Sequence, residues 1–256
     1  MHWAVVVFTT VVAVCVCVFL QRWRQMHTSI FTFPGDLSKL RFHGGKTQET
    51  KEMFLQTQLR KKEALGPKHM STLSTLNNLG ILYSQQGKMK EAKQMHMLAL
   101  KSKEKALGPK HASTLTTVNN LGNFYFDQGK MEEAEEMYVR AFLGRKESLG
   151  AKHPSTLTTI NNLGNLCFEQ GGMEKAEKMY RQALEGFEQA LGSMHESTLD
   201  IVNNLGNLYK NQGSMEEAEK MYLRARKGYE QALGQKHPST LVPSTTSASS
   251  TTSKVS

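Results

Sequence analysis

The sequence predicts an all-α protein, an α-solenoid of antiparallel helix hairpins, and three observations support this prediction. The string Asn-Asn-Leu-Gly recurs with a period of 42, beginning at Asn77, Asn119, Asn161 and Asn203. A histidine and a Gln-Gly pair recur with the same period, and apolar residues follow one another at helical steps within it. Alternating β-strand patterns are weak. A fixed period of this length is typical of solenoids, in which stacked hairpins bury one continuous core.

The chain begins with an apolar segment, residues 1–24. Residues 3–20 form an uncharged run, close in length to the roughly 20 residues that a membrane-spanning helix needs. Arg22 and Arg24 follow this run and favour a cytoplasmic position for its C-terminal side. We therefore expect a signal-anchor, with the rest of the chain facing the cytoplasm. The alternatives are a cleaved secretory signal and an apolar start that is not translated as written, which leaves a cytoplasmic protein.

Three further regions follow the apolar segment. Residues 25–63 are predicted to be a linker and a degenerate leading repeat, because a shift of 42 aligns Gly45-Lys46 with Gly87-Lys88. Residues 64–241 are predicted to hold four complete repeats. Residues 242–256 consist mainly of Ser and Thr, so this tail is predicted to be disordered.

Each repeat is predicted to contain two helices. In the first repeat, Leu73, Leu79 and Tyr83 share one face of the first helix, and Gly87 ends that helix. Small residues, Gly80 and Ala92, are expected to let the two helices approach closely. The methionines of the second helices, such as Met89, Met95 and Met215, are expected in the core. Serines occupy the expected N-cap position of each first helix: Ser71, Ser113, Ser155 and Ser197.

The repeats resemble those of a known family. Leu79-Gly80-x-x-Tyr83 followed by Ala92-x-x-x-His96 resembles the tetratricopeptide signature, and it recurs from Leu121, Leu163 and Leu205. The period of 42 with a Leu-Gly-x-x-His linker, as at residues 107–111, resembles the repeats of kinesin light chains. The resemblance covers roughly residues 48–241. It implies a right-handed superhelix whose first helices line a concave, peptide-binding groove.

The repeated asparagines are the candidate binding residues. An Asn amide donates and accepts at once, so a row of them can pair with the backbone of an extended peptide. In kinesin light chains such groove residues hold short cargo peptides, and the resemblance implies this role for Asn78, Asn120, Asn162 and Asn204. Asn123, Asn165 and Asn207 lie on the same predicted face. The alternative is that the asparagines tie one repeat to the next. Asp127, Glu169 and Asp200 make this face slightly acidic, and Phe126 and Phe168 provide apolar anchors, so basic or aromatic-containing peptides are favoured.

Other kinds of site are not expected. Each of the five recurring histidines, from His69 to His237, occupies its own linker, whereas a metal site needs ligands that converge on one ion. Gly44-Gly45-Lys46-Thr47 lacks the first glycine of a phosphate-binding loop, because Leu40 stands there. No catalytic residues, cofactor or small-molecule substrate are predicted. Nucleic acid is not an expected partner, because the basic excess follows the apolar segment instead of lying on a folded recognition face.

The sequence therefore predicts a non-catalytic scaffold or adaptor that binds extended segments of protein partners. One alternative is a motor subunit of the kinesin light chain type. That family joins its heavy chain through an N-terminal heptad coiled coil, and this chain has an apolar segment there instead. The other alternative is the repeat tail of a larger receptor with an NB-ARC-type nucleotide-binding domain.

Overall fold

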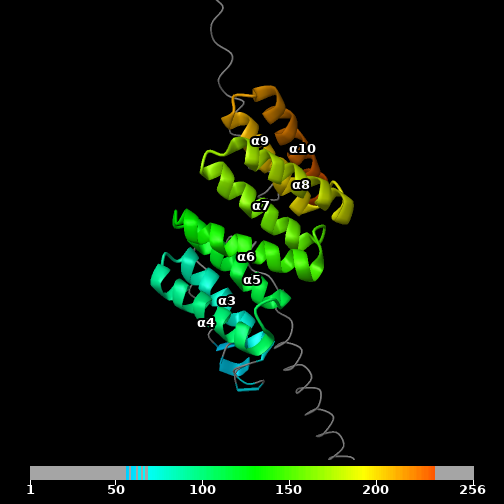
Figure 1. Ribbon diagram of the computed structural model, residues 1–256. Coiled ribbons are helices and arrows are strands. Elements are labelled where there is room, and N and C mark those ends of the chain that lie inside the picture. The colour runs from blue at the N-terminus through cyan, green and yellow to red at the C-terminus, as the bar shows by residue number, and fades with distance from the viewer. Residues whose placement is uncertain (1–55, 58, 62, 65, 67–68, 234–256) are drawn as a thin grey trace, which may run out of the picture. The chain divides into compact units, whose positions relative to one another are not determined.

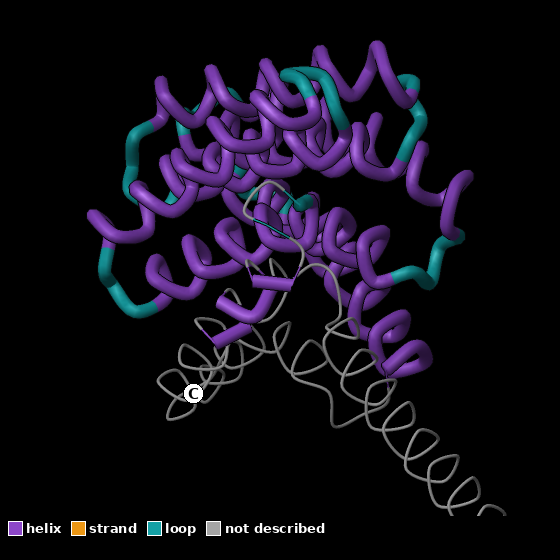
Figure 2. Tube along the Cα trace, turned by 90° about the horizontal axis from the view of Figure 1, so that it is seen from below, coloured by secondary structure: helices purple, strands orange, loops and turns teal. Residues whose placement is uncertain are grey.

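The chain folds into pairs of helices that pack side by side, as its period predicts. The computed structural model describes residues 56–57, 59–61, 63–64, 66 and 69–233 (Figure 1). Its helices in chain order are α3 (Met70–Gln85), α4 (Met89–Leu107), α5 (Ala112–Phe126), α6 (Met131–Leu149), α7 (Pro154–Glu169), α8 (Met173–Leu191), α9 (Glu196–Asn211) and α10 (Met215–Leu233). Figure 2 shows only helices and connecting loops among the described residues. The predicted all-α solenoid of hairpins is confirmed.

Two compact units make up the chain, residues 1–99 and 100–256, and the boundary between them falls within α4. The odd-numbered helices α3, α5, α7 and α9 are the first helices of the repeats, and the even-numbered helices are the second. The larger unit therefore contains three first helices, α5, α7 and α9, each with its own second helix. The candidate functional site described below lies on these three first helices.

Several predictions fall outside the described residues. The predicted anchor at residues 3–20, most of the predicted leading repeat and the predicted tail at 242–256 belong to this group. Within the ranges that the structure describes, no helix is both long enough and apolar enough to cross a bilayer. The anchor therefore stays a prediction.

The N-cap of each first helix is a histidine, so the prediction of serine caps was wrong. His69 is the N-cap of α3, and its Nδ1 accepts a hydrogen bond from the Ser71 amide at 3.2 Å. The same bond recurs from Ser113 to His111 at 3.2 Å, from Ser155 to His153 at 3.1 Å and from Ser197 to His195 at 3.1 Å. Each serine lies inside the first turn, where its own amide is one of the free donors that a cap must satisfy.

The core of each hairpin contains leucines and small residues at the predicted helical spacing. Leu73, Leu79 and Ala92 are buried, as predicted. The prediction that every methionine lies in the core was wrong for Met89 and Met215, which are 39% and 61% exposed. Both stand at the first position of a second helix. The equivalent residues Met131 and Met173, at the first position of α6 and α8, are half-buried.

Buried cations join successive repeats in the larger unit. Arg145 of α6 is only 5% exposed, and its guanidinium donates to Ser155 O at 2.9 Å and to Thr159 Oγ1 at 2.8 Å, both in α7. Lys103 of α4 makes the equivalent contacts with α5, reaching Thr117 Oγ1 at 2.9 Å. One repeat later Phe187 replaces the cation, and Ile201 replaces the threonine. The two positions change together from polar to apolar, so neither side chain is left as a buried polar group without a hydrogen-bond partner.

The first helices form the more closely spaced layer of the larger unit. Helix α7 contacts both α5 and α9 directly, besides its own partner α8. The second helices, by contrast, are linked by long side chains, such as Arg224 of α10 with Glu188 of α8. In a curved stack the closely spaced layer is the inner one. The surface of α5, α7 and α9 is therefore the inner surface of this unit.

Candidate functional site

Asparagines of the first helices form a repeated row with hydrogen bonds between neighbouring first helices, here called the asparagine ladder. It comprises Asn119, Asn120, Asn123, Asn161, Asn162, Asn165, Asn203, Asn204 and Asn207 of α5, α7 and α9. Asn162 Nδ2 donates to two oxygens of the preceding helix, Asn119 Oδ1 at 3.3 Å and Asn123 Oδ1 at 3.2 Å. The next rung repeats this one period later, from Asn204 Nδ2 to Asn161 Oδ1 at 3.1 Å and to Asn165 Oδ1 at 3.2 Å.

A tyrosine of the second helix fixes one asparagine in each repeat. Tyr138 donates its hydroxyl to Asn123 Oδ1 at 2.8 Å. The equivalent bonds are Tyr180 to Asn165 at 2.7 Å and Tyr222 to Asn207 at 2.7 Å. In Asn123 and Asn165 the oxygen thus accepts two hydrogen bonds, which determines the orientation of the amide. The Nδ2 groups of both residues have no partner among the described residues, so each can donate to a ligand.

Burial and nearby carboxylates keep these tyrosines protonated. Burial raises the pKa of Tyr138 well above its usual value, and the Asp127 carboxylate adds to the effect. Burial also raises the pKa of Tyr180, and Glu169 contributes in the same direction. The hydroxyls therefore stay donors at any physiological pH. The effects of Asp127 and Glu169 on these pKa values indicate that a carboxylate lies near the tyrosine–asparagine pair in two successive repeats.

The predicted binding residues occupy three different environments. Asn123, Asn165 and Asn207 are held by tyrosines, while Asn162 and Asn204 use their amides to join neighbouring first helices. Asn120 is only 6% exposed, and its buried Nδ2 has no partner in the described part of the chain. Asn78 is half-buried on α3. The hydrogen bonds expected of inter-repeat ties are thus present, and contact with a peptide stays a prediction for all seven residues.

Sequence reasoning missed the tyrosine partners, although the signal was present. Tyr138, Tyr180 and Tyr222 recur with the same period of 42, at a constant separation from the asparagine that each one contacts. The first repeat departs at both positions, because His96 replaces the tyrosine and Ile81 replaces the asparagine. This paired change marks the two side chains as one contact.

The repeated histidines do not meet. His69, His111, His153 and His195 each cap a separate helix, and all four are exposed. Where the structure describes the chain, no three His, Cys, Asp or Glu side chains gather as metal ligands would. Helix capping accounts for the recurrence of these four histidines.

Comparisons with known proteins agree with this architecture. Two family models, both described as Tetratricopeptide repeat, match residues 113–189 and residues 72–113 and 198–239. A search of curated proteins gave no match. Among solved structures, BtubC (BKLC) from P. vanneervenii is 26% identical with a TM-score of 0.60, covering 76% of this chain and 77% of that one.

The kinesin light chain nearly identical TPR-like repeats of P. anserina are also similar. Their structure is 24% identical with a TM-score of 0.56, covering 74% of this chain and 90% of that one. A single-residue variant of them is 24% identical with a TM-score of 0.57, covering 73% and 88%. At this identity the likeness shows the fold alone. The family matches together span more than half of the chain and coincide with its helix hairpins, so the chain belongs to the tetratricopeptide repeat family.

Proposed function

We propose that this protein-interaction scaffold has no catalytic role and binds an extended segment of a partner protein along the asparagine ladder. The observation that carries the proposal is the fixed orientation of Asn123 and Asn165. Their oxygens are occupied by tyrosine and asparagine donors, so only their Nδ2 groups are available to a ligand. The carbonyl groups of an extended backbone are suitable acceptors. Such bonds need no particular side chain in the partner.

The charge of the inner surface favours a segment that carries Lys or Arg. Helices α5 and α7 contain no Lys or Arg, although the whole chain has a net charge of +9. Asp127 and Glu169 are exposed at the ends of these helices, and Phe126 and Phe168 beside them are half-buried. A carboxylate and an aromatic ring in the same repeat can both attract a cationic side chain. We therefore propose basic segments as the preferred ligands.

The exchange of Asn123 and Asn165 for aspartate tests the proposal. Aspartate keeps an oxygen for the tyrosine hydroxyl but loses the Nδ2 donor, so we expect about tenfold or greater loss of affinity, at about 1 kcal/mol per hydrogen bond. The measurement is fluorescence anisotropy with the tightest basic peptide selected from a display library against the wild-type chain. Because aspartate also adds negative charge, a simple charge effect would strengthen the binding instead.

Asn211→Asp is the matched control for this test. Asn211 ends α9 at the position that Asp127 and Glu169 occupy in the preceding repeats, so the substitution adds charge without removing a tyrosine-held donor. We expect this variant to bind the basic peptide as tightly as wild type or more tightly. Equal affinities for wild type and for Asn123→Asp/Asn165→Asp would show that the ladder does not contact the peptide.

The membrane anchor at residues 3–20 is a separate proposal about where this scaffold acts. It rests on the uncharged apolar run, which is followed by Arg22 and Arg24. Carbonate extraction and protease protection of the full chain, tagged at its C-terminus, test it. We expect the protein to stay in the membrane pellet with its tag digested. Release into the supernatant would contradict the anchor and would leave the ladder proposal unaffected.

A further inference from the structure

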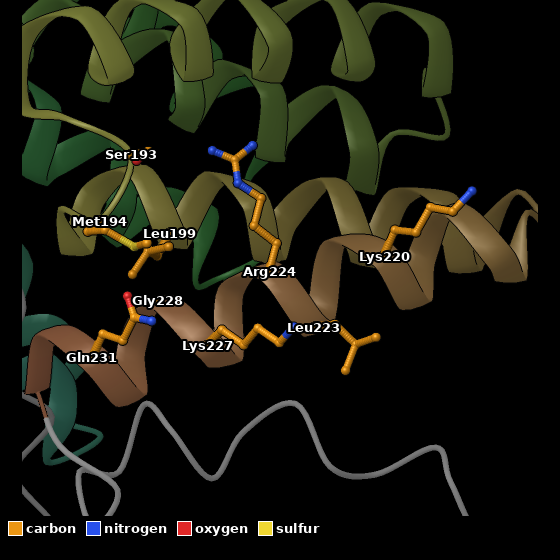
Figure 3. Close-up of a pocket in the computed structure, with 9 residues that line it drawn as sticks. All are labelled: Ser193, Met194, Leu199, Lys220, Leu223, Arg224, Lys227, Gly228 and Gln231. Carbon is orange, nitrogen blue, oxygen red and sulfur yellow. The ribbon is translucent and has the colours of Figure 1, made fainter.

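A pocket of about 450 Å³ opens beside α10, and no residue of the asparagine ladder lines it. Figure 3 shows its lining residues, which come from the α8–α9 linker, from α9 and from one face of α10: Ser193, Met194, Leu199, Lys220, Leu223, Arg224, Lys227, Gly228 and Gln231. Leu199 is fully buried, whereas Met194 and Leu223 are 49% and 44% exposed. Met194, Leu199 and Leu223 form an apolar floor, to which Gly228 adds no side chain. The rim carries the cations of Lys220, Arg224 and Lys227.

The two preceding repeats carry a polar bridge at the equivalent position. Lys110 of the α4–α5 linker donates to Glu147 of α6 at 2.7 Å. One repeat later, Lys152 of the next linker donates to Gln189 of α8 at 3.1 Å. The residues in register with these pairs are Met194 and Gln231. The bridge is therefore replaced by an exposed apolar side chain at the pocket.

The cationic rim is also particular to this repeat. The positions of Lys220, Arg224 and Lys227 are occupied by Glu136, Arg140 and Leu143 in α6, and by Lys178, Gln182 and Glu185 in α8. Lys220 pairs with Glu216, and Arg224 contacts Glu188, but both are pairs near the surface, which are worth little. Lys227 has no partner among the described residues. The rim of this pocket therefore attracts negative charge, and its equivalents in the two preceding repeats do not.

We infer that this pocket binds an acidic segment of a partner protein that inserts one large apolar side chain. The apolar floor of Leu199, Met194 and Leu223 is suited to the side chain, and Lys227 and its neighbours are suited to carboxylates on either side of it. A free anion would leave the apolar floor without a contact. Residues 234–256 of this chain contain Lys236 and Lys254 and no Asp or Glu, so they lack the complementary charge. The inference does not depend on the ladder.

The test uses labelled nonapeptides with Glu-Asp-Glu-Asp on one side and Asp-Glu-Asp-Glu on the other of a central Leu, Phe, Trp or Met. A central Ser gives the control peptide, and fluorescence anisotropy measures affinity. Met194→Lys/Gln231→Glu installs the bridge seen between Lys110 and Glu147 and should weaken binding about tenfold without lowering the thermal midpoint. Lys227→Glu should weaken binding about fivefold or more and reduce its dependence on salt.

Two variants distinguish this pocket from the ladder. Lys210→Glu makes the same charge change on the first-helix side, and Asn123→Asp/Asn165→Asp alters the ladder. Both should leave the affinity for the acidic peptides unchanged, so failure of the ladder proposal cannot account for failure here. If no apolar-centred peptide binds more tightly than the Ser control, or if the bridge leaves affinity unchanged, the inference is wrong. A wild-type dimer that the bridge dissociates in sedimentation would make a second copy the occupant and would also overturn it.

Discussion

Substitution of Gly164 by alanine is expected to lower the free energy of unfolding by about 3 kcal/mol. A Cβ at this position would lie 2.7 Å from Tyr180 Cε1 and 2.8 Å from Cδ1. The tyrosine ring cannot move away cheaply, because its hydroxyl donates to Asn165 and the residue is 2% exposed. In an unconstrained helix interior the same substitution would add about 1 kcal/mol of stability. The sign of the effect therefore reports the close approach of α7 and α8.

Chemical denaturation with Gly164→Ala and Tyr180→Ser, alone and combined, provides the measurement and its control. Tyr180→Ser removes the ring, so alanine at position 164 should then be neutral or stabilising. The effects of the two substitutions on the free energy of unfolding are expected to couple strongly, because the new methyl group clashes only when the Tyr180 ring is present. A stabilising effect of Gly164→Ala in the wild-type background would mean that the two helices are further apart than the structure indicates.

The sequence was sufficient to predict the repeat and its helices, because both depend on periodic properties. Burial of Leu73 and Ala92 follows from helical spacing, and the turn at Gly87 follows from its recurrence. The packing partner of a helix surface is harder to predict. Gly80 was expected to let two helices approach closely, and the structure shows that the group nearest to it on the second helix is the ring of His96. The direction in which a side chain leaves its helix decides such contacts, and spacing alone does not specify it.

The N-caps and the ladder show where sequence rules compete. Serine is a common N-cap, so the sequence predicts Ser71 as the cap, although His69 recurs with the same period. Only backbone geometry shows that the helix begins at the intervening residue. For the ladder, the sequence predicted a shared polar face but not which atoms remain unpaired. That outcome depends on Tyr138 and its equivalents, which approach from a different helix.

The pocket beside α10 was accessible to sequence comparison within the chain. Met194 stands where Lys110 and Lys152 stand in earlier repeats, and this difference can be read without coordinates. Its meaning required the structure, which shows the two lysines bridging to the following second helix. Deviations from an internal repeat are thus candidates for specialised surfaces, and the interaction that is missing at each one indicates the chemistry of that surface.

The first repeat is expected to lose stability as the pH falls from 6.5 to about 4, because of His96. This residue is 1% exposed, its Nδ1 lies 3.3 Å from Asn77 Oδ1, and burial lowers its pKa from 6.5 to about 4. The folded state thus prefers the neutral ring. The contribution of neutral His96 to the free energy of unfolding is fully present above pH 6.5. It falls by up to about 1.4 kcal/mol for each pH unit below that. The total loss at pH 4 is about 3 kcal/mol.

A variant with Ile81→Asn and His96→Tyr restores the tyrosine–asparagine pair of the other repeats and serves as the control. Gly80 faces position 96 as Gly122 faces Tyr138, so the tyrosine ring has the same space. Hydrogen exchange of α3 amides, measured for both proteins between pH 7 and pH 4.5, gives the local stability. The exposed capping histidines are common to both proteins, so the difference between the two isolates residue 96. If the stability of α3 depends on pH in the same way in both proteins, His96 binds a proton as readily in the folded state as in the unfolded state. That result would contradict the prediction.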